Sequence, residues 1–159
     1  MSNRALTVTS APLPPDSLLA RLRGAECYRD AFRVEVSRRV DLAASLRAFY
    51  GSAAFAPERL ALALIGRDAT HADIAALAEG RTDRFAAWTV EARQPCEILL
   101  RDFRDATCSW LMAEATGERA STLWFGSAVR HPERALVTAL MPFHRRYSRR
   151  LLAGAVGDP

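Results

Sequence analysis

Three apolar residues on one side, Phe32, Val34 and Val36, alternate with the polar residues Arg33, Glu35 and Ser37 in the segment that follows Tyr28. A period of two is typical of a strand that buries one face and exposes the other, and we predict a strand here. Upstream of it, three prolines between residues 12 and 15 disfavour helix, and Gly24 ends the next apolar run. Residues 1–25 are therefore predicted to form an extended entry followed by a short helix.

Two helices are predicted after this strand, because apolar residues now recur every three or four positions. Asp41 is a suitable N-cap for the first helix, which ends at Gly51. Pro57 suits the first turn of the second helix, which ends at Gly66.

Residues 67–83 allow two interpretations. Thr70, followed three positions later by Asp73, resembles a capping box and predicts a short helix that closes at Gly80. The segment could equally be a mobile loop.

A second group of strands follows, with turn residues between them. The predicted strands are 86–92, 97–100, 107–115 and 121–129. In the third of these, Trp110 and Met112 share one face, and in the fourth Phe125 shares a face with Leu123. Trp124 lies on the opposite face of its strand, which predicts a partly exposed residue or an interface residue.

The chain ends in a predicted amphipathic helix at residues 132–154. Its apolar stripe consists of Leu136, Leu140, Phe143, Tyr147 and Leu151. Strands joined by short turns pair antiparallel, and only this helix is long enough to cover their apolar face. We expect one α+β domain over residues 1–159, in which a curved antiparallel sheet wraps around the C-terminal helix, with short helices between the first strands.

Four segments of the chain resemble the START-like, helix-grip superfamily (SRPBCC), which includes polyketide cyclases, and more narrowly a bacterial family of unknown function within it. They are 13–15 with the short helix after it, 28–34, 123–129 and 142–152. The resemblance implies a helix-grip fold with a cavity between the sheet and the C-terminal helix, and it implies no particular reaction. Some relatives carry a histidine in the central hairpin, whereas residues 101–106 of this chain contain none.

The composition narrows the possible chemistry. Half of the 159 residues are hydrophobic and a quarter are charged, which is typical of a globular domain. All 22 basic residues are arginine, so the chain has no lysine for a Schiff base or a P-loop. The nucleotide-binding, zinc-protease, serine-hydrolase and calcium-binding motifs are absent. We predict no cofactor and no metal site, and a net charge of +4 gives no reason to expect a nucleic-acid partner.

The compartment is predicted from three further features of the sequence. No uncharged apolar stretch approaches the roughly 18 residues of a membrane span, and the first residues do not resemble a signal peptide. The three cysteines are widely spaced and form no CxxC pair, which favours free thiols in a reducing environment. We therefore expect a cytoplasmic protein without an integral membrane segment.

Three residues are candidates for proton transfer. His144 borders the apolar stripe of the last helix and could act as a general base, bond a ligand oxygen, or bond a backbone carbonyl in the seam between helix and sheet. Tyr147 lies one turn further on, where its hydroxyl could face the same space or complete the core. Asp30 shares a side with Phe32, so it either faces inward or bonds backbone at the start of the strand.

A small hydrophobic or amphipathic molecule, such as a lipid, an isoprenoid or an aromatic metabolite, is the expected ligand of a non-catalytic binding protein. The candidate ligand-binding residues are Trp88, Trp110, Met112, Phe125, Leu140, Phe143, His144 and Tyr147. One alternative is a cyclase, hydratase or isomerase that uses His144 with Tyr147 or Asp30. The other is an interaction module or homodimer formed through Trp124.

Overall fold

The computed structural model describes residues 6–23, 28–130 and 135–157, and for 135–144 and 157 it describes the backbone alone. Its strands are β1 (Thr9–Ser10), β2 (Tyr28–Val36), β3 (Arg84–Phe85), β4 (Trp88–Gln94), β5 (Glu97–Asp102), β6 (Thr107–Gly117) and β7 (Ala120–Val129). Its helices are α1 (Leu42–Gly51), α2 (Ala56–Leu64), α3 (His71–Ala78) and α4 (Ala135–Gly157). The predicted α+β class is thereby confirmed.

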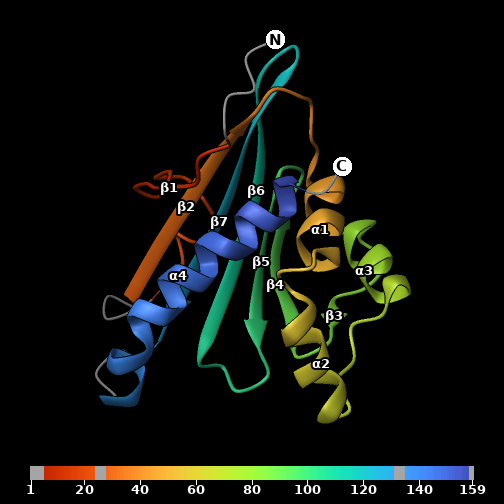
Figure 1. The fold of residues 1–159 in the computed structure, drawn as a ribbon, viewed down its shortest axis with the longest axis vertical. Coiled ribbons are helices and arrows are strands. Elements are labelled where there is room, and N and C mark those ends of the chain that lie inside the picture. The colour runs from red at the N-terminus through yellow and green to blue at the C-terminus, as the bar shows by residue number, and fades with distance from the viewer. Residues whose placement is uncertain (1–5, 24–27, 131–134, 158–159) are drawn as a thin grey trace.

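All strands join one antiparallel sheet in the order β1-β2-β7-β6-β5-β4-β3. The edge strands β1 and β3 contain two residues each. The helices cover one face of this sheet, where α4 contacts β2 and β7, and α1 contacts β6, α3 and α4. Figure 1 shows α4 lying across the strands, with α1, α2 and α3 beside it. We call this the helical face; its core includes Phe32, Phe49, Leu111 and Phe125.

The opposite face of the sheet is also covered, by residues 11–22, which we call the strap. Leu19 of the strap is fully buried against the apolar side chains of this face. These are Ala31, Leu99, Cys108, Trp110, Met112, Trp124 and Ala128. Gly126 permits the close approach of the strap, because a Cβ atom there would lie 2.7 Å from Leu19 Cδ2. Both faces of β7 are consequently buried, and the sheet is the middle layer of three.

The strap contains turns and no α-helix, so the short helix predicted before Gly24 is wrong. The Leu18 backbone N–H donates to Glu97 Oε2 at 2.9 Å, and the Ala20 N–H donates to Ser17 Oγ at 3.2 Å. The Ser17 contact has the geometry of a helix N-cap, and the Arg21 N–H donates to the Ser17 carbonyl at 3.1 Å. The Leu22 N–H donates to the Leu19 carbonyl at 3.3 Å, so the segment tightens into turns after a single helical bond. Gly24 itself lies outside the described residues.

The helices between β2 and β3 begin where the sequence predicts, and α1 ends at Gly51 as predicted, whereas α2 ends at Leu64, two residues before the predicted Gly66. Asp41 caps α1 by accepting a hydrogen bond from the Ala44 N–H at 2.7 Å. The short-helix interpretation of residues 67–83 is confirmed, since α3 begins with a complete capping box between Thr70 and Asp73. Gly80 closes this segment with a φ of 70°, which favours glycine.

The sequence predicted that the C-terminal helix ends at residue 154, whereas α4 continues to Gly157. Gly154 has a different role, because a Cβ atom there would lie 2.8 Å from Ala54 Cβ. The glycine therefore permits close packing between α4 and the segment after α1. The predicted start at residue 132 lies outside the described residues. Within the described ranges, the structure contains no helix with the length and apolar composition needed to cross a membrane.

Candidate functional site

A cavity of about 200 Å³ lies on the helical face, between the sheet and the helices. Its apolar lining comes from α1 and the turn that follows it, with Phe49, Tyr50 and Phe55, and from the sheet, with Trp88 and Phe125. Its polar lining consists of Glu58, Thr107, Ser109, Ser127, Tyr147 and Ser148. The cavity therefore combines an aromatic wall with a polar side.

The aromatic wall is a continuous set of ring contacts. The Phe49 and Phe125 ring centroids lie 4.8 Å apart, and those of Tyr50 and Phe55 lie 5.1 Å apart in an edge-to-face arrangement. Trp88 extends the set, with its centroid 6.3 Å from that of Phe55. Such packing fixes the rings in place, so the wall has a defined shape before any ligand binds.

The polar side begins with a row of side chains across three strands. The register places Ser127 of β7 between Asp30 of β2 and Ser109 of β6, and directly paired residues share one face of a sheet. Asp30 and Ser127 are both buried. The row therefore puts hydrogen-bonding groups into the floor of an otherwise apolar face.

Two hydroxyl groups at the cavity lack hydrogen-bond partners among the described residues. They are Ser127 Oγ, in the sheet, and Ser148 Oγ, on α4. Both serines are buried, and a buried hydroxyl without a partner costs about 1–3 kcal/mol. A molecule in the cavity that bonds these hydroxyls would recover this free energy.

The third polar feature is a contact between α4 and α2. The Tyr147 hydroxyl donates a hydrogen bond to Glu58 Oε2 at 2.7 Å. Burial and the adjacent Glu58 carboxylate raise the pKa of Tyr147 well above its usual value, and burial does the same to the pKa of Tyr50. Both phenols are therefore protonated at neutral pH, so neither serves as a general base there.

The sequence-predicted site residues divide into three groups. Trp88, Phe125 and Tyr147 line the cavity. Asp30 is buried on the same face of the sheet, next to Ser127 in the register. Leu140, Phe143 and His144 belong to the part of α4 whose side chains lie outside the described residues.

Trp110 and Met112 lie on the other face of the sheet, under the strap, so the prediction that they line the cavity is wrong. The prediction assumed that each strand has one apolar face, whereas β6 is apolar on both sides because the strap covers the second. Trp124 is buried there as well, with the Arg33 guanidinium 5.7 Å from its ring. The expectation of a partly exposed Trp124 is therefore also wrong.

The sequence interpretation missed Glu58, Ser127 and Ser148. Ser127 had a detectable signal, because it shares the parity of Phe125 and is a polar residue at an inward position of an apolar strand. Ser148 directly follows Tyr147 of the apolar stripe of α4, and this position could have identified it as a candidate for the cavity lining. Glu58 had no signal, since an acidic residue in the first turn of a helix is ordinarily solvated.

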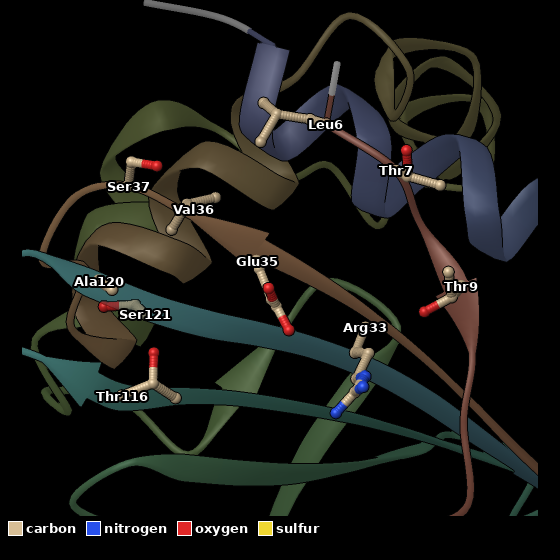
Figure 2. A pocket seen from close by; sticks show the side chains of 10 residues that line it. All are labelled: Leu6, Thr7, Thr9, Arg33, Glu35, Val36, Ser37, Thr116, Ala120 and Ser121. Atoms are coloured by element: carbon tan, nitrogen blue, oxygen red, sulfur yellow. The ribbon is translucent and has the colours of Figure 1, made fainter. Parts of the chain in front are cut away.

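A groove of about 480 Å³ lies at the other end of β2, between the N-terminal segment and the ends of β6 and β7. Figure 2 shows the Arg33 and Glu35 side chains along β2, with Thr9 of β1 beside them, among the residues that line this groove. Its polar groups already serve the fold: Arg33 lies against Trp124, and Ser121 Oγ accepts a hydrogen bond from the Val40 N–H at 3.0 Å. The groove is thus larger than the cavity, but we identify no buried polar group in it that needs a ligand.

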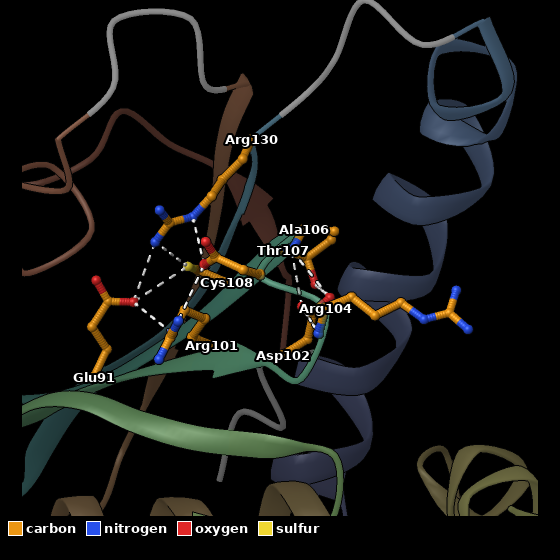
Figure 3. Close-up of polar contacts among 9 residues, drawn as sticks. Glu91, Arg101, Asp102, Arg104, Ala106, Thr107, Cys108 and Arg130 are labelled. Carbon is orange, nitrogen blue, oxygen red and sulfur yellow. Dashed lines mark hydrogen bonds and ion pairs between the residues drawn. The ribbon is translucent and has the colours of Figure 1, made fainter.

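A second polar cluster surrounds Cys108 at the end of the sheet that carries the β5–β6 turn (Figure 3). Glu91 Oε2 lies 3.3 Å from Arg130 Nη2 and 3.7 Å from Arg101 Nε, so the cluster links β4, β5 and the end of β7. Burial raises the pKa of the Cys108 thiol, although Arg130 acts in the opposite direction. The thiol is therefore protonated at neutral pH, and we interpret the cluster as structural.

Comparison of the chain with family models, with curated proteins and with solved structures gives no match.

Proposed function

We propose that this protein binds a small amphipathic molecule in the cavity on the helical face, without transforming it. The observation that carries the proposal is the pair of unpartnered hydroxyls, Ser127 Oγ and Ser148 Oγ, on opposite layers of an aromatic cavity. Core packing alone gives no reason to retain two such groups, because alanine at either position would avoid the cost of burial.

The cavity volume limits the size of the ligand. An engineered apolar cavity of about 150 Å³ accommodates benzene, whereas pockets for drug-sized molecules measure about 300–1,000 Å³. A volume of about 200 Å³ therefore favours a compound of one ring or a short branched chain. Lipids with long acyl chains, which were among the ligands expected from the sequence, are disfavoured.

The lining sets the polarity of the ligand. One flank of the ligand contacts the rings of Phe49, Phe125 and Trp88. A carbonyl or hydroxyl on its other flank reaches Ser127 or Ser148, each of which donates one hydrogen bond and accepts others. Because Tyr147 already donates to Glu58, its phenol is not needed for this contact.

We further propose that the architecture is a helix-grip fold of the START-like type. An antiparallel sheet with a long C-terminal helix across one face and a cavity between them supports this assignment. The two cysteines of the described residues, Cys96 and Cys108, are free thiols, and we propose a cytoplasmic location on that basis.

A fragment screen tests the binding proposal. Ligand-observed NMR with one-ring phenols, cyclic ketones and indoles should identify binders, and Ser148→Ala and Ser127→Ala should each weaken the best of them about tenfold. The same substitutions should raise the melting temperature of the ligand-free protein, because each removes an unpartnered buried hydroxyl.

Ser52→Ala is the matched control. Ser52 is buried, its Oγ donates to the Phe49 carbonyl at 2.8 Å, and it does not line the cavity. This variant should lower stability and leave fragment affinity unchanged. Binding that is insensitive to both cavity serines, or the absence of any fragment binder, would refute the proposal.

A further inference from the structure

Exposed apolar side chains gather at the end of the molecule that α2 and the β5–β6 turn form. We call them the end patch: Leu60, Leu64, Ile65 and Phe103, which are 65%, 80%, 60% and 51% exposed. Leu60 and Leu64 are one helical turn apart and therefore lie on the same outward face of α2. Figure 1 shows α2 and the β5–β6 turn at the same end of the molecule, away from the N-terminal segment.

Two arginines connect the parts of the end patch. The Arg67 guanidinium lies 4.3 Å from the Phe103 ring centroid, and the Arg104 guanidinium lies 5.3 Å from it. Arg67 follows α2 and Arg104 belongs to the β5–β6 turn, so both segments meet at Phe103. Neither arginine forms an ion pair within the part of the chain that the structure describes.

The neighbouring carboxylates are occupied by contacts within the turn and the sheet. Asp102 accepts hydrogen bonds from the Arg104 and Ala106 N–H groups, at 3.0 and 2.9 Å. Asp105 Oδ1 lies 3.5 Å from Arg101 Nη1 and 3.4 Å from Arg130 Nε. Asp68, next to Arg67, accepts a hydrogen bond from the Ala69 N–H at 2.7 Å and forms no ion pair among the described residues. The two unpaired guanidinium groups of the patch therefore exceed its one unpaired exposed carboxylate, and an anion that binds beside them is attracted.

We propose that the end patch docks this protein onto an anionic lipid surface. Leu64, Ile65 and Phe103 enter the boundary between headgroups and acyl chains, while Arg67 and Arg104 bind lipid phosphates. The charge complementarity supports this occupant. A projecting apolar end also suits a bilayer, which admits projecting side chains, whereas a protein partner would have to supply a matching concave pocket.

Vesicle co-sedimentation of the full chain tests this inference. The protein should bind phosphatidylcholine vesicles that contain phosphatidylglycerol, and bind pure phosphatidylcholine vesicles far more weakly. Arg67→Gln/Arg104→Gln should weaken binding to the anionic vesicles about 30-fold, since each surface cation contributes roughly a fivefold step. Leu64→Ser/Ile65→Ser should weaken it at least about tenfold.

Arg38→Gln/Arg119→Gln is the matched control, because it removes the same charge at the opposite end of the sheet. Arg38 follows β2 and Arg119 lies in the β6–β7 hairpin, and both are exposed. Since all these side chains are at the surface, circular dichroism should show unchanged folding. The inference fails if the wild type does not bind anionic vesicles, or if the control reduces binding as much as the end-patch variants do.

The end patch does not depend on the cavity. Loss of fragment binding in the cavity-serine variants, with vesicle binding intact, would separate the two proposals. A protein that does not bind vesicles and sediments with twice the mass of one chain would overturn the lipid proposal. If Leu64→Ser/Ile65→Ser restored the mass of a single chain, the end patch would be a dimer interface.

Discussion

Replacing Glu97 by alanine should detach the strap from the sheet. Glu97 is 4% exposed, and its Oε2 atom accepts hydrogen bonds from Trp110 Nε1 at 2.7 Å and from the Leu18 N–H at 2.9 Å. It forms no ion pair among the described residues. Among the described residues, the Glu97 carboxylate thus makes the only side-chain hydrogen bond between the strap and β5.

The size of the effect follows from the two donors. Each buried donor that loses its acceptor costs about 1–3 kcal/mol, and removing a buried carboxylate recovers part of that sum. We expect Glu97→Ala to lower the free energy of unfolding by about 3 kcal/mol, which corresponds to a fall in melting temperature of about 10 °C for a chain of this size. Urea unfolding followed by tryptophan fluorescence measures it.

Glu97→Gln is the matched control, because its amide oxygen still accepts both hydrogen bonds; its cost should be below about 1 kcal/mol. In a Trp110→Phe background, Glu97→Ala should cost about 1–2 kcal/mol less, since one donor is already gone. Equal losses in Glu97→Ala and Glu97→Gln would show that the charge matters and the hydrogen bonds do not. That result would refute the reasoning.

Three more outcomes are expected. Gly154→Ala should lower the melting temperature, because its Cβ would lie 2.8 Å from Ala54 Cβ, whereas Gly51→Ala, with no atom within 4 Å, should leave it unchanged or raise it. Because the pKa of Tyr147 is raised in the folded protein, its protonated phenol contributes fully to the free energy of unfolding below the ordinary tyrosine pKa of about 10. This contribution is lost as the pH rises through the folded-state pKa. Tyr147→Phe should therefore reduce the loss of stability at alkaline pH, measured by urea unfolding curves at a series of pH values. Thr70→Ala should cost about 1 kcal/mol in thermal unfolding through loss of the α3 capping box, and no change would contradict that assignment.

Local sequence signals predicted most of the secondary structure, because they report local physics. The Asp41 cap, the Thr70–Asp73 capping box and the period of β2 each depend on residues within one turn or one strand. Antiparallel order followed from the short connections between strands. The long C-terminal helix followed from its stripe at three- and four-residue spacing.

The side of the sheet that each residue faces could not be predicted as well. β6 is apolar on both faces from Trp110 to Ala113, and β7 is apolar on both faces from Leu123 to Phe125, so parity does not show which face meets the helices. The answer depends on the strap, whose turns are held by the long-range bond from Leu18 to Glu97. The same limit applies to the candidate site, because Glu58 reaches Tyr147 across 89 positions of sequence.

The two-residue strands β1 and β3 at the margins of the sheet have a consequence for self-association. A long, flat outer strand offers unpaired amides and carbonyls to an incoming chain and so seeds fibrous aggregates. Here β1 pairs with only Phe32 and Arg33 of the nine-residue strand β2, and β3 pairs with only Trp88 and Thr89 of the seven-residue strand β4, so the short strands cover only part of each margin. Charged side chains on the two longer strands, Arg33 and Glu35 on β2 and Glu91 and Arg93 on β4, oppose the pairing of further chains along the remaining positions.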